Sequence, residues 1–174
     1  MRVGAGAALI MLVTVATISW AATPVARVDT GAMLTDFRDA AGKPAAVPTY
    51  ASLTLDAEAL HLRIECHEPQ MSRLLAKCHR DGDSAVFRDD CVEVFVNPSG
   101  GETGYLHFVS NANGVRWAEK GKGGAPLTLA WKAQAARTAD AWMVVMDLPL
   151  STLGGPPARG SVWWFNVCRQ RQAG

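Results

Sequence analysis

Hydrophobic and polar residues alternate along most of the chain after residue 50. In residues 58–66, Leu60, Leu62 and Ile64 fall on one face, while His61 and Arg63 fall on the other. This period of two is typical of a strand that buries one face. The same pattern predicts seven further strands, at residues 50–55, 91–96, 105–110, 115–119, 127–133, 142–148 and 162–168.

Turn signals separate nearly all of these segments. Examples are Asp81-Gly82-Asp83, Asn113-Gly114 and Gly154-Gly155-Pro156-Pro157. The longest run with a helical character, residues 69–77, is short, and residues 22–48 have no clear period. We therefore expect an all-β domain, an antiparallel β-sandwich rather than an α/β fold, preceded by an extended segment with one edge strand.

The first residues have the pattern of a secretory signal peptide. Met1 and Arg2 give a positive start, residues 3–18 carry no charge, and Ser19-Trp20-Ala21 places small residues at a cleavage site. The alternative is a transmembrane anchor, because residues 3–22 are about long enough to span a bilayer. We expect cleavage after Ala21, leaving residues 22–174 as one secreted or periplasmic domain that does not contact the membrane.

Composition excludes two classes of protein. Residues 1–21 contain Arg2 and no acidic residue, so the 17 basic and 16 acidic residues of the whole chain become 16 of each after cleavage. A neutral domain lacks the electrostatic footprint of a nucleic-acid binder. A hydrophobic content of 49% and a mean hydropathy of +0.06 are too high for an intrinsically disordered chain.

The chain has four cysteines, an even number, and none lies in a C-x-x-C pair. In an oxidising compartment such cysteines form disulfides, for which three pairings exist. We favour Cys66 with Cys78 and Cys91 with Cys168, and buried reduced thiols are the alternative.

Signatures of catalysis are missing from the sequence. It contains no nucleophile elbow, zincin motif, dinucleotide fingerprint or phosphate-binding loop. Glycoside hydrolysis needs two carboxyl groups on either side of a sugar bond, but Asp90 and Glu93, three apart on a strand, would point to opposite faces. We therefore expect a domain that is not itself an enzyme.

Carboxylates gather between residues 81 and 93. Four of them offer the oxygen ligands that calcium prefers, although their spacing fits no EF-hand: Asp81, Asp83, Asp89 and Asp90. The first two are also typical of a turn, and the last two of an exposed strand entry. No cofactor is expected on this basis, with calcium as the alternative. Glu93 lies inside a predicted strand, either on its solvated face or in a recess that binds a polar ligand.

Segments spread over the chain resemble, in order, the family 9 carbohydrate-binding modules. The resemblance covers about residues 50–171. Those modules are DOMON-like, or jelly-roll-like, β-sandwiches often joined to extracellular glycoside hydrolases. The matching residues are Leu60-His61-Leu62-Arg63-Ile64, His67-Glu68-Pro69, Asp89-Asp90-Cys91-Val92-Glu93-Val94-Phe95-Val96, Tyr105-Leu106-His107-Phe108, Asn111, Asn113-Gly114, Trp142, Leu148-Pro149-Leu150, Leu153-Gly154, Trp164-Phe165-Asn166-Val167 and Arg169.

The resemblance implies a ligand site and a function. Phe87 matches an aromatic residue that stacks on a terminal sugar, Glu93 matches a glutamate that accepts bonds from sugar hydroxyls, and Asn166 matches an asparagine of the last recognisable strand. By this resemblance the chain is expected to be a secreted, non-catalytic module that binds a poly- or oligosaccharide, with a glycoside hydrolase as a partner in carbohydrate catabolism.

Three positions differ from the family pattern. Val109 stands where the family has an arginine, Val145 stands where a glutamate is expected, and the C-terminal W-x-D-P segment with the second stacking aromatic is missing before Gly174. We therefore expect weak binding and a chain that is a fragment of a longer protein.

Two other functions fit the sequence. DOMON-like sandwiches include haem-binding redox domains, for which the candidate iron ligands here are Met71, Met143, Met146, His67 and His107. A purely structural domain of an envelope protein is the third interpretation.

Overall fold

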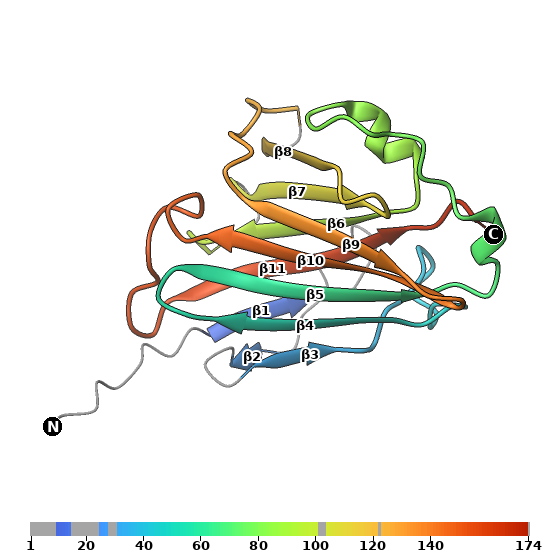
Figure 1. Ribbon diagram of the computed structural model, residues 1–174. Helices are drawn as coiled ribbons and strands as arrows, with labels where there is room; N and C mark the ends of the chain where they lie inside the picture. Colours follow the sequence, from blue (N-terminus) through green and yellow to red (C-terminus); the bar gives the residue numbers. More distant parts are fainter. Residues whose placement is uncertain (1–9, 15–24, 28–30, 101–103, 122, 174) are drawn as a thin grey trace, which may run out of the picture.

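The computed structural model describes residues 10–14, 25–27, 31–100, 104–121 and 123–173, which form two packed sheets (Figure 1). The six-stranded sheet has the order β2 (Val25–Arg27), β1 (Ile10–Thr14), β11 (Val162–Gln170), β6 (Cys91–Asn97), β7 (Leu106–Asn111) and β8 (Arg116–Lys120). The five-stranded sheet has the order β3 (Ala32–Leu34), β4 (Thr49–Leu55), β5 (Ala59–His67), β10 (Ala141–Pro149) and β9 (Lys132–Arg137). Every neighbouring pair is antiparallel except β1 with β11. The predicted antiparallel β-sandwich is confirmed.

The main core lies between the two sheets, because alternate residues of each strand face inward. In β6, Val92, Val94 and Val96 are fully buried in this core. The largest fully buried side chains come from both layers and include Trp131, Trp142, Phe108 and Phe165. Burial of this much apolar surface is the main stabilising contribution.

One predicted strand is displaced. The segment 127–133 was expected to be a strand, but β9 begins at Lys132. The guanidinium of Arg116 donates hydrogen bonds to the carbonyl oxygens of Leu129 (3.0 Å) and Trp131 (2.6 Å). These carbonyl oxygens therefore bond to a side chain and not to a neighbouring strand. The alternation of hydrophobic and polar residues in 127–133 does not reveal this.

The predicted helical run at 69–77 is also much shorter in the structure. Only Met71–Arg73 forms a turn of 3₁₀-helix, η1, and a second such turn, η2, spans Ser84–Arg88. Among the described residues, no helix has the length and apolar character needed to cross a membrane.

Most of the predicted leader, and its cleavage site after Ala21, lie outside the described residues. The described part of the leader is β1, which runs parallel to β11 with Ile10 opposite Val162 and Thr14 opposite Asn166. Residues 22–48 were expected to contain one edge strand, but the structure has two there, with β2 at the edge of the six-stranded sheet and β3 at the edge of the five-stranded sheet.

A second, smaller apolar cluster lies on the outer face of the six-stranded sheet. Val86 of η2 packs there with Cys78, Cys91, Val109 and Val115. Cys91 and Val109 alternate with core residues of β6 and β7, so they face away from the main core. The segment that carries η2 therefore covers one end of this outer face.

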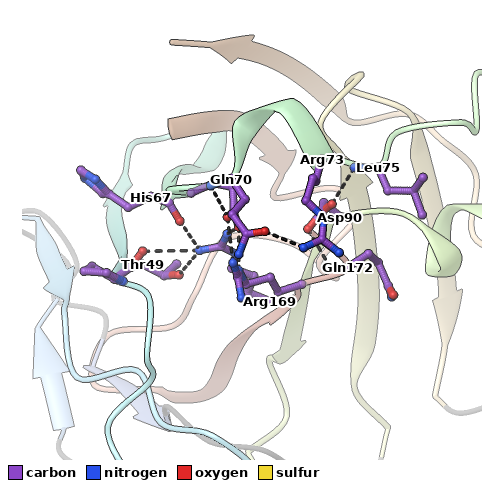
Figure 2. A network of polar contacts seen from close by, with 11 residues as sticks. Thr49, His67, Gln70, Arg73, Leu75, Asp90, Arg169 and Gln172 are labelled. Atoms are coloured by element: carbon purple, nitrogen blue, oxygen red, sulfur yellow. Dashed lines mark hydrogen bonds and ion pairs between the residues drawn. The ribbon is translucent and has the colours of Figure 1, made fainter. Parts of the chain in front are cut away.

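A buried ion pair joins the two sheets at the end where β11 finishes (Figure 2). The carboxylate of Glu68, which directly follows β5, accepts hydrogen bonds from Arg169 (3.1 Å) and from Arg171 (2.6 and 2.8 Å). Arg169 also donates to the His67 carbonyl oxygen at 2.8 Å. Glu68 is completely buried, and the hydrogen bonds from Arg171 hold the pKa of its carboxyl below the usual value despite that burial.

The pair Asp89 and Asp90 was expected to be exposed, but both are buried. Asp90 accepts from the backbone N–H of Leu75 (2.8 Å) and of Gln172 (2.9 Å). Asp89 accepts from two further backbone N–H groups and from the Asn111 side chain. These carboxylates therefore fix the long loop before β6, since each satisfies N–H groups that have no strand partner.

The predicted disulfides are not formed, because all four cysteines are reduced thiols. Cys66 lies in the main core while Cys78 lies in the outer cluster, so the six-stranded sheet separates them. Cys91 is opposite Gln170 and Cys168 is opposite Glu93, which makes the second pair diagonal neighbours. Diagonal neighbours are about 7–8 Å apart, beyond the usual Cα separation of a disulfide of about 4.4–6.8 Å.

The reduced thiols should be countable. Burial raises the pKa of Cys66 and of Cys168 to about 12, so both should react slowly with a maleimide in the native protein. After unfolding without a reductant, mass spectrometry should show a label on every cysteine. A protein that takes up two labels or none would contain disulfides and contradict this structure.

Replacing Glu68 should strongly destabilise the fold. Glu68→Gln leaves two guanidinium groups without their carboxylate, and breaking a buried pair costs about 3–5 kcal/mol of unfolding free energy. Because the pKa of Glu68 is lowered in the folded protein, its contribution is present at neutral pH and is lost as the pH falls through the acid range. Denaturant unfolding at neutral and acid pH should therefore show a smaller difference between variant and parent in acid. The exposed Glu58→Gln is the matched control, and an equal effect of both changes would contradict the role of Glu68.

Candidate functional site

The outer face of the six-stranded sheet carries polar and aromatic side chains in regular rows. Asn166, Phe95, His107 and Glu119 form one row across β11, β6, β7 and β8. The next row is formed by Cys168, Glu93, Val109 and Trp117. This register brings together residues that are far apart in the sequence. We call the surface formed by these two rows the outer face.

Glu93 is held in the outer face by two side chains. Its Oε2 atom lies 2.9 Å from Nε2 of His107, and its Oε1 atom accepts a hydrogen bond from Gln170 at 3.0 Å. Burial acts to raise the pKa of Glu93, but the hydrogen bonds from His107 and Gln170 outweigh it and leave the pKa below its usual value. Glu93 is 8% exposed, so it lies in a recess rather than on a solvated face. It is therefore an ionised acceptor with a fixed orientation.

Aromatic rings surround His107. Phe95 stacks on its imidazole with ring centroids 4.2 Å apart, and Trp117 meets it edge-on at 5.4 Å. Tyr105 packs edge-on against Phe95 at 5.6 Å. Phe95, Tyr105 and Trp117 are half-buried, so each keeps part of its ring surface accessible. Flat, partly exposed rings beside a carboxylate are the features with which proteins bind ring-shaped polar ligands.

Phe87 is placed over the same face by η2. This turn is capped by Asp83, whose side chain accepts a hydrogen bond from the Ala85 backbone N–H at 2.9 Å. Phe87 then packs edge-on against Trp117, with centroids 4.7 Å apart, and lies 5.8 Å from the His107 ring. The predicted pair Phe87 and Glu93 is therefore brought together through His107.

Asn166 belongs to the same face but lies farther along it. It is opposite Phe95 in the strand register, and its side-chain amide donates to Sγ of Cys168 at 3.5 Å. All three residues that the sequence suggested for ligand binding therefore share one surface. Their role in binding remains a prediction.

Two departures from the family pattern have a structural explanation. Val109 is completely buried in the small apolar cluster, between Glu93 and Trp117 in register. A guanidinium in its place would lie among apolar side chains, so Val109 contributes packing and no ligand contact. Val145 belongs to β10, on the outer surface of the five-stranded sheet, and is not part of the outer face.

The carboxylates suggested for calcium all have other partners. Asp81 forms an ion pair with Arg116 at 2.6 Å, and Asp83 with Arg80 at 3.0 Å. Asp89 and Asp90 accept from backbone N–H groups, as described above. Within the described part of the chain, no group of three or more His, Cys, Asp or Glu side chains is arranged to hold a metal ion.

The residues suggested for haem lie in three parts of the fold. Met146 is in the main core, and Met71 packs against that core from η1. Met143 is half-buried on β10, opposite Glu65, and His67 forms an ion pair with Glu65 at 3.3 Å, whereas His107 lies on the outer face of the other sheet. By this register Met143 and His67 are diagonal neighbours on the outer surface of the five-stranded sheet, whereas the other candidates lie apart from them, and haem binding stays an untested alternative.

Several residues of the outer face were not predicted as sugar contacts: Phe95, Tyr105, His107, Trp117, Glu119 and Gln170. The alternation within each strand was visible in the sequence and could have placed each on an outward face. The pairing register that makes them neighbours was not, because strand order does not follow from the pattern of a single strand.

Comparisons with known proteins point to one fold. No protein-family model matches the chain, and no curated protein matches it either. Among solved structures, a candidate carbohydrate-binding protein from Bacteroides uniformis matches with a TM-score of 0.59 and 18% identity over 71% of this chain and 63% of that one.

A family 9 carbohydrate-binding module from Caldicellulosiruptor kristjanssonii also matches, in two complexes. With glucose the TM-score is 0.56, at 19% identity over 73% of this chain and 61% of that one. With cellotriose the TM-score is 0.55, at 18% identity over 73% of this chain and 60% of that one. The chain thus spans between 60% and 63% of the length of these three structures. It has the β-sandwich fold of the family 9 carbohydrate-binding modules.

Proposed function

We propose that this chain binds carbohydrate on the outer face without catalysing a reaction. The observation that carries the proposal is the fixed carboxylate of Glu93 beside the accessible rings of Phe87, Phe95 and Trp117. A pyranose has an apolar face that packs on such rings and hydroxyl groups that donate to a carboxylate.

The solved structures support this proposal. One neighbour is a module in complex with glucose and with cellotriose. The likeness establishes the fold, and the arrangement of Glu93 and the rings is what extends it to a sugar site in this chain.

The two acids that the sequence offered for hydrolysis, Asp90 and Glu93, are separated in the structure, which supports a non-catalytic role for this pair. Asp90 is held by backbone N–H groups at the loop before β6, while Glu93 faces the outer face with His107. These two acids therefore do not flank a common space, as a hydrolase would require. We propose further that the domain is exported and holds a poly- or oligosaccharide near a glycoside hydrolase, which performs the chemistry.

Export should be visible at the N-terminus. The apolar start and the small residues before Ala22 predict a mature chain that begins at or within a few residues of Ala22. Mass spectrometry of protein from the secreted or periplasmic fraction measures this directly. An intact Met1 on membrane-bound protein would contradict export with cleavage.

Substitutions in the outer face should weaken sugar binding. Phe87→Ala removes a stacking surface and should cost about 1–3 kcal/mol of binding free energy. Glu93→Gln keeps the shape but removes the charged acceptor, and should cost about 1–2 kcal/mol. Calorimetric titration of the parent with cello-oligosaccharides should give a dissociation constant of about 0.1–1 mM, since Val109 stands where the family pattern has an arginine.

The control is Val145→Thr, on the surface of the other sheet, which should leave the affinity unchanged. Thermal unfolding of each variant separates a lost contact from a lost fold. If the parent binds none of a broad panel of glycans, or if Glu93→Gln unfolds the domain while Phe87→Ala has no effect, the outer face is structural and the proposal is wrong.

A further inference from the structure

The outer face carries more negative than positive charge. Glu93 and Glu119 lie on either side of His107, with Glu93 Oε2 at 2.9 Å from Nε2 and Glu119 Oε1 at 3.7 Å from Nδ1 of the imidazole. The side chains of these three residues are only 10%, 14% and 8% exposed, respectively. Two carboxylate side chains therefore share a single imidazole.

Among the partners that the described residues provide, those of Glu119 are weaker than those of Glu93. Its distance to His107 exceeds that of a hydrogen bond. The one hydrogen bond that the described residues give to it comes from the backbone N–H of Gly123, at 3.2 Å to Oε1. Glu119 Oε2 can therefore accept a hydrogen bond from a ligand at the margin of the aromatic surface.

Elsewhere in this fold, enclosed carboxylates are matched by donors. Glu68 has two arginines, Asp90 has the backbone N–H groups of Leu75 and Gln172, and Asp89 has two backbone N–H groups and Asn111. Among the described residues, the ion pairs of Glu93 and Glu119 are with His107, and none is with lysine or arginine. An enclosed charge without a matching cation is costly, and a positively charged ligand would relieve that cost.

The rings around His107, which lies next to Glu119 in the row, favour the same kind of ligand. Trp117 and Phe95 both contact His107, and aromatic faces attract cations as well as apolar surfaces. Building on the proposed sugar site, we infer that the outer face prefers a sugar that carries a protonated amino group, a hexosamine, and that Glu119 is the residue that binds the ammonium. Stacking on the rings and donation to Glu93 would be shared by all sugars, whereas the bond to Glu119 would distinguish the amino sugars.

A matched series of ligands tests the inference. Glucose, glucosamine, N-acetylglucosamine and glucuronate share a pyranose ring but differ in charge. At about pH 6, glucosamine should bind about tenfold more tightly than glucose, and glucuronate should bind most weakly. The preference for glucosamine should shrink as sodium chloride is added, because the added salt screens the charges.

The variant Glu119→Gln should reduce the ratio of glucosamine to glucose affinity to about one. Glu58→Gln, an exposed glutamate remote from the outer face, is the matched control and should keep the parent ratio. Asp36→Asn is a second control for the general loss of one negative charge.

The outcomes separate this inference from the proposed function. If glucose binds and glucosamine binds no more tightly, sugar binding stands and the preference for amino sugars is wrong. If Glu119→Gln keeps the preference, Glu119 is not the residue that binds the ammonium. If none of the four sugars, and no oligosaccharide, binds to the parent, both proposals fail. A tenfold preference that disappears in Glu119→Gln and persists in Glu58→Gln would establish the inference.

Discussion

The pairing register of β6, β7 and β8 is the constraint on which the rest of the structure depends. It places Val94 opposite Phe108 in the core and, one residue away, Phe95 opposite His107 on the outer face. Because side chains alternate along a strand, a shift of one residue would bury His107 and Glu93 between the sheets and expose the valines. The apolar core and the polar outer face are therefore two consequences of one register.

Acidic residues stabilise the parts of the fold that are not held by hydrogen bonds between strands. Asp89 and Asp90 bind backbone N–H groups of the loop before β6, and Glu68 binds the arginines at the end of β11. These carboxylates hold the loop that carries η2, and η2 in turn places Phe87 beside Trp117. The candidate site thus depends on buried charges outside it, each satisfied by N–H donors. Glu119 differs from them, because it has a single backbone donor.

Much of the fold could be predicted from the sequence, because period two and turn residues are local signals. The strands predicted from these signals end within a few residues of the observed ones, apart from β9. Its start lies next to carbonyl groups that bind the Arg116 side chain. The burial of Asp90 could not be foreseen, since one of its donors is the N–H of Gln172. The disulfide prediction was wrong because it used sequence spacing, whereas the sheet places Cys66 and Cys78 on opposite sides. For the site, the resemblance selected Phe87, Glu93 and Asn166 as ligand residues, but their shared face, and His107 that connects two of them, required the register.

The most direct test of the account is to map the binding surface by NMR. Backbone amide shifts of the isotope-labelled domain would be followed during titration with cellotriose and with glucosamine. The account predicts that the perturbed amides cluster on η2, β6, β7 and β8, around Phe87, Glu93 and Glu119. Shift changes that cluster on the five-stranded sheet would contradict the account. So would a complete lack of shift changes at a saturating sugar concentration.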